Sequence, residues 1–120
     1  MLAGLVAAAA LTAMEPAIEN DLRCIGIFAL AASRHEEMSQ SEQAGVTGAL
    51  MYYVGRIEGR RPDFRLEDSL ADLLRSPAYL EGLADDARRC GAEMKAKGQQ
   101  LSDLGKAMKQ TGKESPAEGD

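Results

Sequence analysis

The sequence SPAYLEGLADDARRCGAEMKAKGQQLSDLGKAMKQ occupies residues 76–110 and decides the fold. Ser76 suits the N-cap of a helix and Pro77 suits its first position. The apolar residues that follow recur every three or four positions, which places them along one stripe of a helix. A helix of this length reaches about 50 Å at 1.5 Å per residue, so the rest of the chain must cover it. The stripe consists of Leu80, Leu83, Ala87, Cys90, Met94, Leu101, Leu104 and Met108.

Small residues form a second track beside this stripe, and an earlier helix carries a similar one. Each glycine inside a helix costs about 1 kcal/mol relative to alanine. We therefore predict that closely packed neighbours lie against both tracks. The residues are Ala84, Gly91, Gly98 and Gly105 in the long helix, and Ala44, Gly48, Gly55 and Gly59 in the earlier one.

Two helices of about 20 residues are predicted before the long one, each spanning roughly 30 Å. The first is expected to begin with Asn20 or Asp21 as its cap. Its residues 24–32 are apolar almost all round, which predicts a helix surrounded by neighbours at the centre of a bundle. Ser39 and Glu42 match a capping box that opens the second helix, and Pro62 ends it. The predicted buried faces are Leu22, Ile25, Phe28, Ala29 and Ala32, and then Val46, Leu50, Val54 and Ile57.

A short third helix is predicted from Asp63 or Phe64 up to Ser76, with Leu66, Leu70, Leu73 and Leu74 on its apolar face. No stretch alternates with a period of two, so no sheet is expected. The predicted fold is all-α, a small four-helix bundle with a long C-terminal helix. Its helical domain covers residues 20–111, and residues 112–120 are rich in Gly, Pro, Ser and Glu, which is typical of a disordered tail.

The N-terminal residues favour export. The run from Leu2 to Met14 is apolar or small except for Thr12, and it is too short for a membrane span of roughly 20 residues. Such a run is typical of a signal-peptide core, and Ala13 offers a small residue for cleavage. We interpret residues 1–13 as a signal peptide of a periplasmic protein that has no transmembrane span in its mature form. No lysine or arginine precedes the run, so a buried N-terminal helix remains an alternative.

The two cysteines, Cys24 and Cys90, are predicted to form a disulfide because exported proteins oxidise paired cysteines. This bond would hold the first helix to the last. Closing a loop of this length stabilises a fold by about 4 kcal/mol. The alternative, two buried free thiols in a cytosolic protein, depends on whether the chain is exported.

The residues do not form a recognisable catalytic or metal-binding motif. His35 is the single histidine, so a Ser/His/Asp arrangement would need partners that only the fold can place. Glu36 and Glu37 follow it, but adjacent helical positions point about 100° apart and do not face one ion. The glycine-rich run 45–48 lacks the lysine of a phosphate-binding loop. We therefore predict a protein without enzymatic activity, catalytic residues, metal or cofactor.

One group of side chains suggests a ligand-binding site, and it consists of Tyr52, Arg56 and Arg60. They lie four residues apart on one helix face, so a phenol and two guanidinium groups would meet an anionic ligand together. The alternative is a tyrosine whose ring is buried and arginines paired with acids of the third helix. A further alternative is an enzyme with its active site in this region, but the sequence offers no nucleophile or general base for it.

Charge bears on the choice of partner. The net charge of −5 and the absence of tryptophan give no support to nucleic-acid binding. Residues 63–86 carry seven acids and two arginines, whereas residues 88–113 carry seven bases and two acids. The helix macrodipole favours this order, and weak contact of the basic end with an anionic surface is the alternative.

The far end of the long helix is predicted to overhang the bundle and to contact a second copy or another protein. The residues of this predicted contact are Leu101, Leu104 and Met108. The alternative is that the second helix runs along the overhang and buries it.

One resemblance follows from the order of three features: a cysteine in the first helix, the Tyr-x-x-Gly step of Tyr52 to Gly55, and a cysteine in the last helix. In this order the chain resembles periplasmic acid-stress chaperones of the HdeA-like type, although its loop between the cysteines is longer. It is also similar to small exported helical proteins of alphaproteobacteria, which have no assigned function. The resemblance implies a periplasmic, non-enzymatic protein with a chaperone-like or protein-binding role.

Overall fold

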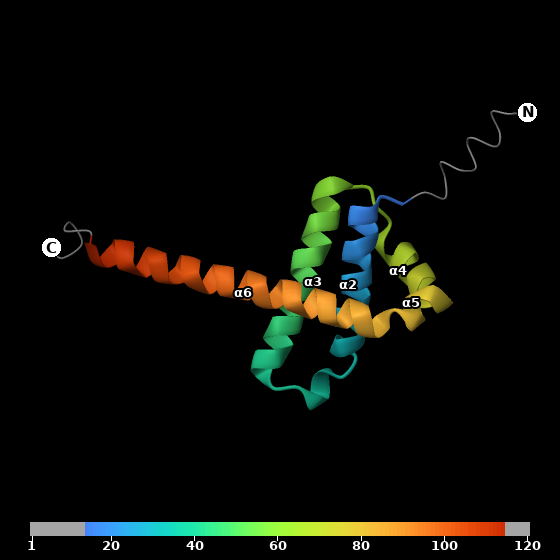
Figure 1. The fold of residues 1–120 in the computed structure, drawn as a ribbon, viewed down its shortest axis with the longest axis horizontal. Helices are drawn as coiled ribbons and strands as arrows, with labels where there is room; N and C mark the ends of the chain where they lie inside the picture. The colour runs from blue at the N-terminus through green and yellow to red at the C-terminus, as the bar shows by residue number, and fades with distance from the viewer. Residues whose placement is uncertain (1–13, 115–120) are drawn as a thin grey trace, which may run out of the picture.

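The structure, a computed structural model, describes residues 14–114 (Figure 1). Within that range the chain is helical without strands, and it has a long C-terminal helix, so the predicted fold class is confirmed. The predicted signal peptide, residues 1–13, and residues 115–120 of the predicted tail lie outside the described part. The elements are α2 (Pro16–Ala32), the 3-10 helix η1 (His35–Glu37), α3 (Gln40–Arg60), α4 (Leu66–Leu74), α5 (Pro77–Glu81) and α6 (Leu83–Glu114).

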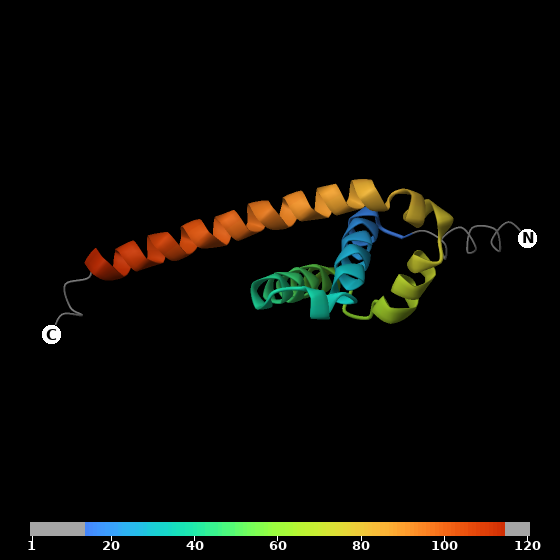
Figure 2. The same cartoon turned by 90° about the horizontal axis from the view of Figure 1, so that it is seen from below.

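Helix α2 is the centre of the molecule, as predicted, but its buried part is residues 18–26 and not the whole apolar run 24–32, since Leu30 is 44% exposed. It packs against α3, α4 and α6, and these helices surround it in Figures 1 and 2. The predicted start at Asn20 or Asp21 is wrong, because α2 begins at Pro16 with Glu15 in the extended cap conformation. Proline is accommodated there since the first helical position has no internal partner for an N–H. The buried cluster consists of Ile18, Leu22, Cys24, Ile25, Tyr53, Ile57 and Cys90.

The predicted start of α3 is confirmed in atomic detail. The Glu42 N–H donates to the Ser39 hydroxyl oxygen, and the Ser39 N–H donates to the Glu42 carboxylate, each over 3.1 Å. This capping box satisfies two N–H groups that a helix start would otherwise leave unpaired. Helix α3 ends at Arg60, just before Pro62, as expected.

The predicted continuous helix over residues 76–110 is wrong at one point. Gly82 separates α5 from α6, and its N–H bonds back to the carbonyl oxygens of Ala78 and Tyr79. Because of this break Tyr79 is buried and Leu80 is 52% exposed, although the predicted stripe contains Leu80 and not Tyr79. The predicted single helix is thus a one-turn helix followed by a long one.

Helix α6 crosses α2 and α3 and then extends far beyond both (Figures 1 and 2). It continues to Glu114, so residues 112–114 of the predicted tail are helical. The predicted close packing against the glycine tracks is also wrong within this chain. A Cβ atom built at Gly48, Gly55, Gly91, Gly98 or Gly105 would have no neighbouring atom within 4 Å.

None of the helices among residues 14–114 has the length and apolar character required to cross a membrane.

Candidate functional site

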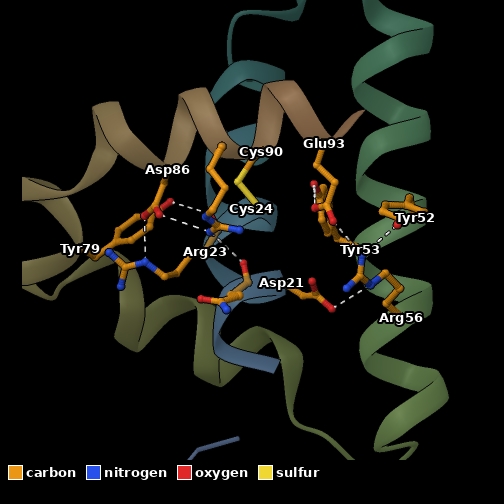
Figure 3. Close-up of a disulfide and its surroundings, with 12 residues drawn as sticks. Asp21, Arg23, Cys24, Tyr52, Tyr53, Arg56, Tyr79, Asp86, Cys90 and Glu93 are labelled. Atoms are coloured by element: carbon orange, nitrogen blue, oxygen red, sulfur yellow. Dashed lines mark hydrogen bonds and ion pairs between the residues drawn. A yellow bond between two sulfur atoms is a disulfide. The ribbon is translucent and has the colours of Figure 1, made fainter. Parts of the chain in front are cut away.

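Cys24 on α2 and Cys90 on α6 form the predicted disulfide, with an S–S distance of 2.04 Å and a Cα–Cα distance of 5.5 Å. Both cysteines are fully buried. The disulfide lies between two polar clusters, each of which also joins α2 to other helices (Figure 3). The covalent bond and the two clusters together fix the first third of α6 on the body of the protein.

The first cluster centres on Arg56 of α3, which binds acids from two other helices. Its Nε lies 3.2 Å from Asp21 Oδ2 on α2, and its Nη1 lies 3.1 Å from Glu93 Oε2 on α6. The same Nη1 donates to the Tyr52 hydroxyl oxygen over 2.8 Å, and the guanidinium lies over the Tyr52 ring. One side chain therefore ties three helices together.

Tyr53 completes this cluster. Its ring is fully buried, and its hydroxyl donates a 2.6 Å hydrogen bond to Glu93 Oε1. This hydrogen bond, assisted by Arg56, holds the pKa of Glu93 below its usual value, while burial raises the pKa of Tyr53. Glu93 is therefore a carboxylate whose charge the fold stabilises.

Asp21 behaves in the opposite way. It is 3% exposed, and its Oδ2 makes no hydrogen bond of good geometry within the protein although Arg56 is near. Burial raises the pKa of Asp21, and the attraction of Arg56 only partly offsets this. The cluster thus contains two acids around one arginine. The pKa of Asp21 is raised, whereas the pKa of Glu93 is lowered.

The second cluster lies on the other side of the disulfide. Arg23 Nε donates to Asp86 Oδ2 over 2.8 Å, and Asp86 is buried at the start of α6. The Arg23 guanidinium also lies over the ring of Tyr79, whose hydroxyl donates to the Arg23 carbonyl oxygen over 3.1 Å. These contacts hold the α5–α6 corner against α2.

The structure brings together two of the three predicted ligand-binding residues. Tyr52 and Arg56 are in contact, but Arg60 is exposed at the end of α3 and has no ion pair among the described residues. The acids that pair with Arg56 come from α2 and α6, not from the third predicted helix. An anionic ligand would have to displace Asp21 or Glu93 from Arg56.

His35, Glu36 and Glu37 form the exposed 3-10 turn η1. Within residues 14–114, no group of three or more His, Cys, Asp or Glu side chains is arranged to hold a metal ion.

The acids of the two clusters were not predicted, although the sequence contains a signal for them. Asp21 lies three residues before Cys24, while Asp86 and Glu93 lie four residues before and three after Cys90. Residues at these spacings share a helix face. Acids at these spacings from the two cysteines lie close to the bond, where Asp21 and Asp86 are buried and Glu93 is half-buried.

The second candidate site is the arm, which we define as residues 98–113 of α6. Every residue of the arm is exposed. Leu101, Leu104 and Met108 are 58%, 55% and 67% exposed, so α3 does not bury the overhang. Lys97, just before the arm, still contacts the body, with its Nζ 5.7 Å from the Tyr52 ring centroid.

Comparisons of the chain with protein-family models, with curated proteins and with solved structures find no match.

Proposed function

We propose that this is an exported, non-enzymatic protein that binds other proteins through the arm, in a protein-interaction or chaperone-like role. The observation that carries the proposal is the apolar stripe of Leu101, Leu104 and Met108, which is more than half exposed on a helix that projects from the body. Contiguous apolar surface of this kind usually marks a contact site.

Two observations support export to the periplasm. The disulfide fits an oxidising compartment, because the reducing cytosol of most organisms keeps thiols free. The apolar run that precedes Met14 has the length of a signal-peptide core. A disulfide also suits a chain whose buried cluster is as small as this one.

The ligand-binding alternative is less well supported. Arg56 already meets two carboxylates, and its guanidinium is engaged with Tyr52 as well. A free anion would compete with an ion cluster that spans three helices, with its acids on α2 and α6.

Photocrosslinking tests the proposed contact in cells. A benzophenone amino acid replaces Leu101 in one variant and Gln99 in the control. The two positions lie on the same exposed arm but about 160° apart, since successive helical residues are separated by about 100°. A protein adduct at position 101 that is weak or absent at position 99 is the expected result. Equal yields at both positions, or no adduct at 101, would reject the arm as a binding element.

Truncation after Gln100 provides a second test. If the arm is a contact element, the shortened protein keeps its helical body and its disulfide but no longer co-purifies with the partner that crosslinks at position 101 of the full chain. Wholesale unfolding would show that the arm is part of the folding unit instead.

A further inference from the structure

We propose that a second surface of α6, the basic face, binds the surface of an anionic phospholipid membrane. This face is turned away from the body and from the apolar stripe of the arm. The inference goes beyond the proposed function and does not depend on it, because the two contacts use different faces of one helix. The basic face consists of Lys95, Lys106, Lys109 and Lys113.

Lysine and arginine are fully separated along the chain. All five lysines lie within residues 95–113, whereas all nine arginines lie within residues 23–89. The arginines include those that hold the fold together, since Arg23 and Arg56 pair with acids of other helices. Among the described residues, the lysines of the basic face form no ion pair. Arginine suits fixed, bidentate pairs, whereas lysine is a flexible point charge that suits a diffuse anionic surface.

The basic face points away from the body. At about 100° per residue its lysines lie about 100–160° around α6 from Cys90, which is bonded to α2. They lie about 110–170° from the middle of the apolar stripe. Figure 2 shows α6 along one edge of the molecule, with α2, α3 and α4 on the same side of it. A flat surface therefore reaches the basic face over its length of about 27 Å without meeting the body.

Three of the lysines repel one another in the free protein. Lys106, Lys109 and Lys113 are three and four residues apart, and like charges at these spacings destabilise a helix. Together they line a hollow of about 240 Å³. The one acid within residues 95–113, Asp103, accepts a hydrogen bond from Gln99 over 3.0 Å and does not pair with a lysine. A lipid phosphate in contact with the lysines would offset their repulsion.

The helix macrodipole does not account for the basic face. Its attraction for cations falls off within the last turn of a helix, so it acts on Lys113. Helix α6 ends at Glu114, and Lys95 and Lys106 lie many residues before that end. The position of these two lysines therefore needs another reason, which an extended anionic surface supplies.

A membrane fits the basic face better than a protein or a nucleic acid does. Lysine is depleted in protein interfaces. Single-stranded nucleic acids stack on aromatic side chains, and residues 95–113 contain none. The body is acidic around residues 63–86, but a helix about 10 Å wide separates it from the membrane. This distance exceeds the Debye length of about 8 Å, so the repulsion of the body is screened.

The contact is electrostatic, and α6 lies on the headgroups without inserting. The apolar stripe faces away from the lipid and remains open to a protein partner. Each basic residue close to an anionic surface strengthens binding by about fivefold. Binding is therefore expected to weaken as the salt concentration rises.

Vesicle flotation of the full chain tests the membrane contact. Vesicles of mixed phosphatidylglycerol and phosphatidylcholine should bind the protein more strongly than vesicles of phosphatidylcholine alone, which measure binding that is independent of lipid charge. Lys106→Gln with Lys109→Gln should weaken binding to the anionic vesicles by about 25-fold. Arg34→Gln with Arg60→Gln is the matched control. It removes the same charge from exposed side chains outside α6, and it should bind as the native protein does. Circular dichroism checks that each variant is folded.

Acetylation of the lysines on the vesicles tests the orientation of α6. Lys97 is the internal reference, because it lies on the body side with its Nζ 5.7 Å from the Tyr52 ring centroid. Anionic vesicles should slow the acetylation of Lys95 and Lys106 several-fold and should leave the rate at Lys97 almost unchanged. Mass spectrometry measures each rate.

Three outcomes would overturn the inference: equal binding to both kinds of vesicle, equal binding by the lysine variant and its control, and equal protection of Lys97 and the basic face. Displacement from the vesicles by inorganic phosphate at constant ionic strength would assign a free anion instead. Self-association without vesicles that the lysine variant lacks would assign a second copy. Either result rejects the membrane.

The proposed function is judged separately by the crosslink at position 101. An adduct there without binding to anionic vesicles keeps the function and rejects the inference, whereas vesicle binding without an adduct does the reverse.

Discussion

Gly26 on α2 lies directly under the hydroxyl group of Tyr79 on α5. A Cβ atom at Gly26 would overlap the Tyr79 hydroxyl oxygen and would lie 3.0 Å from its Cζ. Gly26 is thus required by packing, since only a residue without a side chain lets the buried tyrosine reach the Arg23 carbonyl oxygen. This contact is the close approach that sequence analysis had assigned to other glycines.

The first prediction concerns this contact. Gly26→Ala should lower the free energy of unfolding by about 1–3 kcal/mol, because the added methyl group forces Tyr79 out of place. Denaturant unfolding measures the change. Gly98→Ala is the matched control, since nothing lies within 4 Å of its Cβ position, and it should raise helix stability by up to about 1 kcal/mol. Equal effects at the two glycines would contradict the packing described here.

The second prediction concerns the disulfide. Replacing Cys24 and Cys90 by serine should destabilise the fold by about 4 kcal/mol, since the bond closes a long loop in the unfolded chain. Thermal unfolding of the wild type with and without reductant should show a comparable loss, whereas the variant should not respond to reductant. Mass spectrometry of the unreduced protein checks the bond itself. If both thiols are alkylated without reductant, the disulfide is not formed, and the argument for export is weakened.

The third prediction concerns Asp21, whose pKa is raised by burial above its ordinary value of 3.8. The folded protein therefore holds this proton more tightly than the unfolded chain does. The resulting stability is fully present below pH 3.8 and is lost as pH rises through the folded pKa. The Asp21→Asn variant does not undergo this loss. The stability of the variant relative to wild type should therefore improve with rising pH. Chemical unfolding at several pH values measures the difference, and a difference independent of pH would contradict the prediction.

The fourth prediction concerns Glu93, where the sign is reversed. Its pKa lies below the ordinary value of 4.5, so its contribution is present above pH 4.5 and is lost as pH falls through the folded pKa. Wild type should therefore lose the anchorage of α6 in acid. Glu93→Gln should lack that part of the acid response because its side chain does not titrate.

Binding of a hydrophobic dye between neutral and acid pH reports the same event. Increased binding in acid, smaller in relative terms for Glu93→Gln, would support an acid-responsive, chaperone-like role. The acid-responsive role is rejected if wild type binds the same amount of dye at neutral and acid pH and its near-ultraviolet dichroism does not change. The arm would then be a contact element that is active at every pH.

Local features of the sequence predicted local structure well. The Ser39–Glu42 capping box is confirmed because every atom in it belongs to four consecutive residues. The break at Gly82 was not predictable in this way, since Tyr79 is held by α2, more than fifty residues earlier in the chain. The helical periodicity of the sequence continues through Gly82, so it did not indicate the break between α5 and α6, which depends on tertiary contacts.

The polar cluster shows the same limit. The Tyr52 and Arg56 pair was predictable because the residues lie one helical turn apart. Asp21 and Glu93 belong to other helices, and which acid would meet Arg56 depended on how three helices cross. The spacing of both acids from the cysteines placed them near the disulfide, but it did not identify their partner.

The disulfide also determines how mechanical load passes through the molecule. Cys24 and Cys90 close residues 24–90 into a covalent ring that contains α3, α4 and α5, and the arm hangs outside this ring. Tension applied along the arm first reaches Lys97 and Glu93, whose contacts with α3 lie between the arm and Cys90. Once these contacts yield, the sulfur–sulfur bond passes the load directly to α2, so that α4 and α5 inside the ring are by-passed.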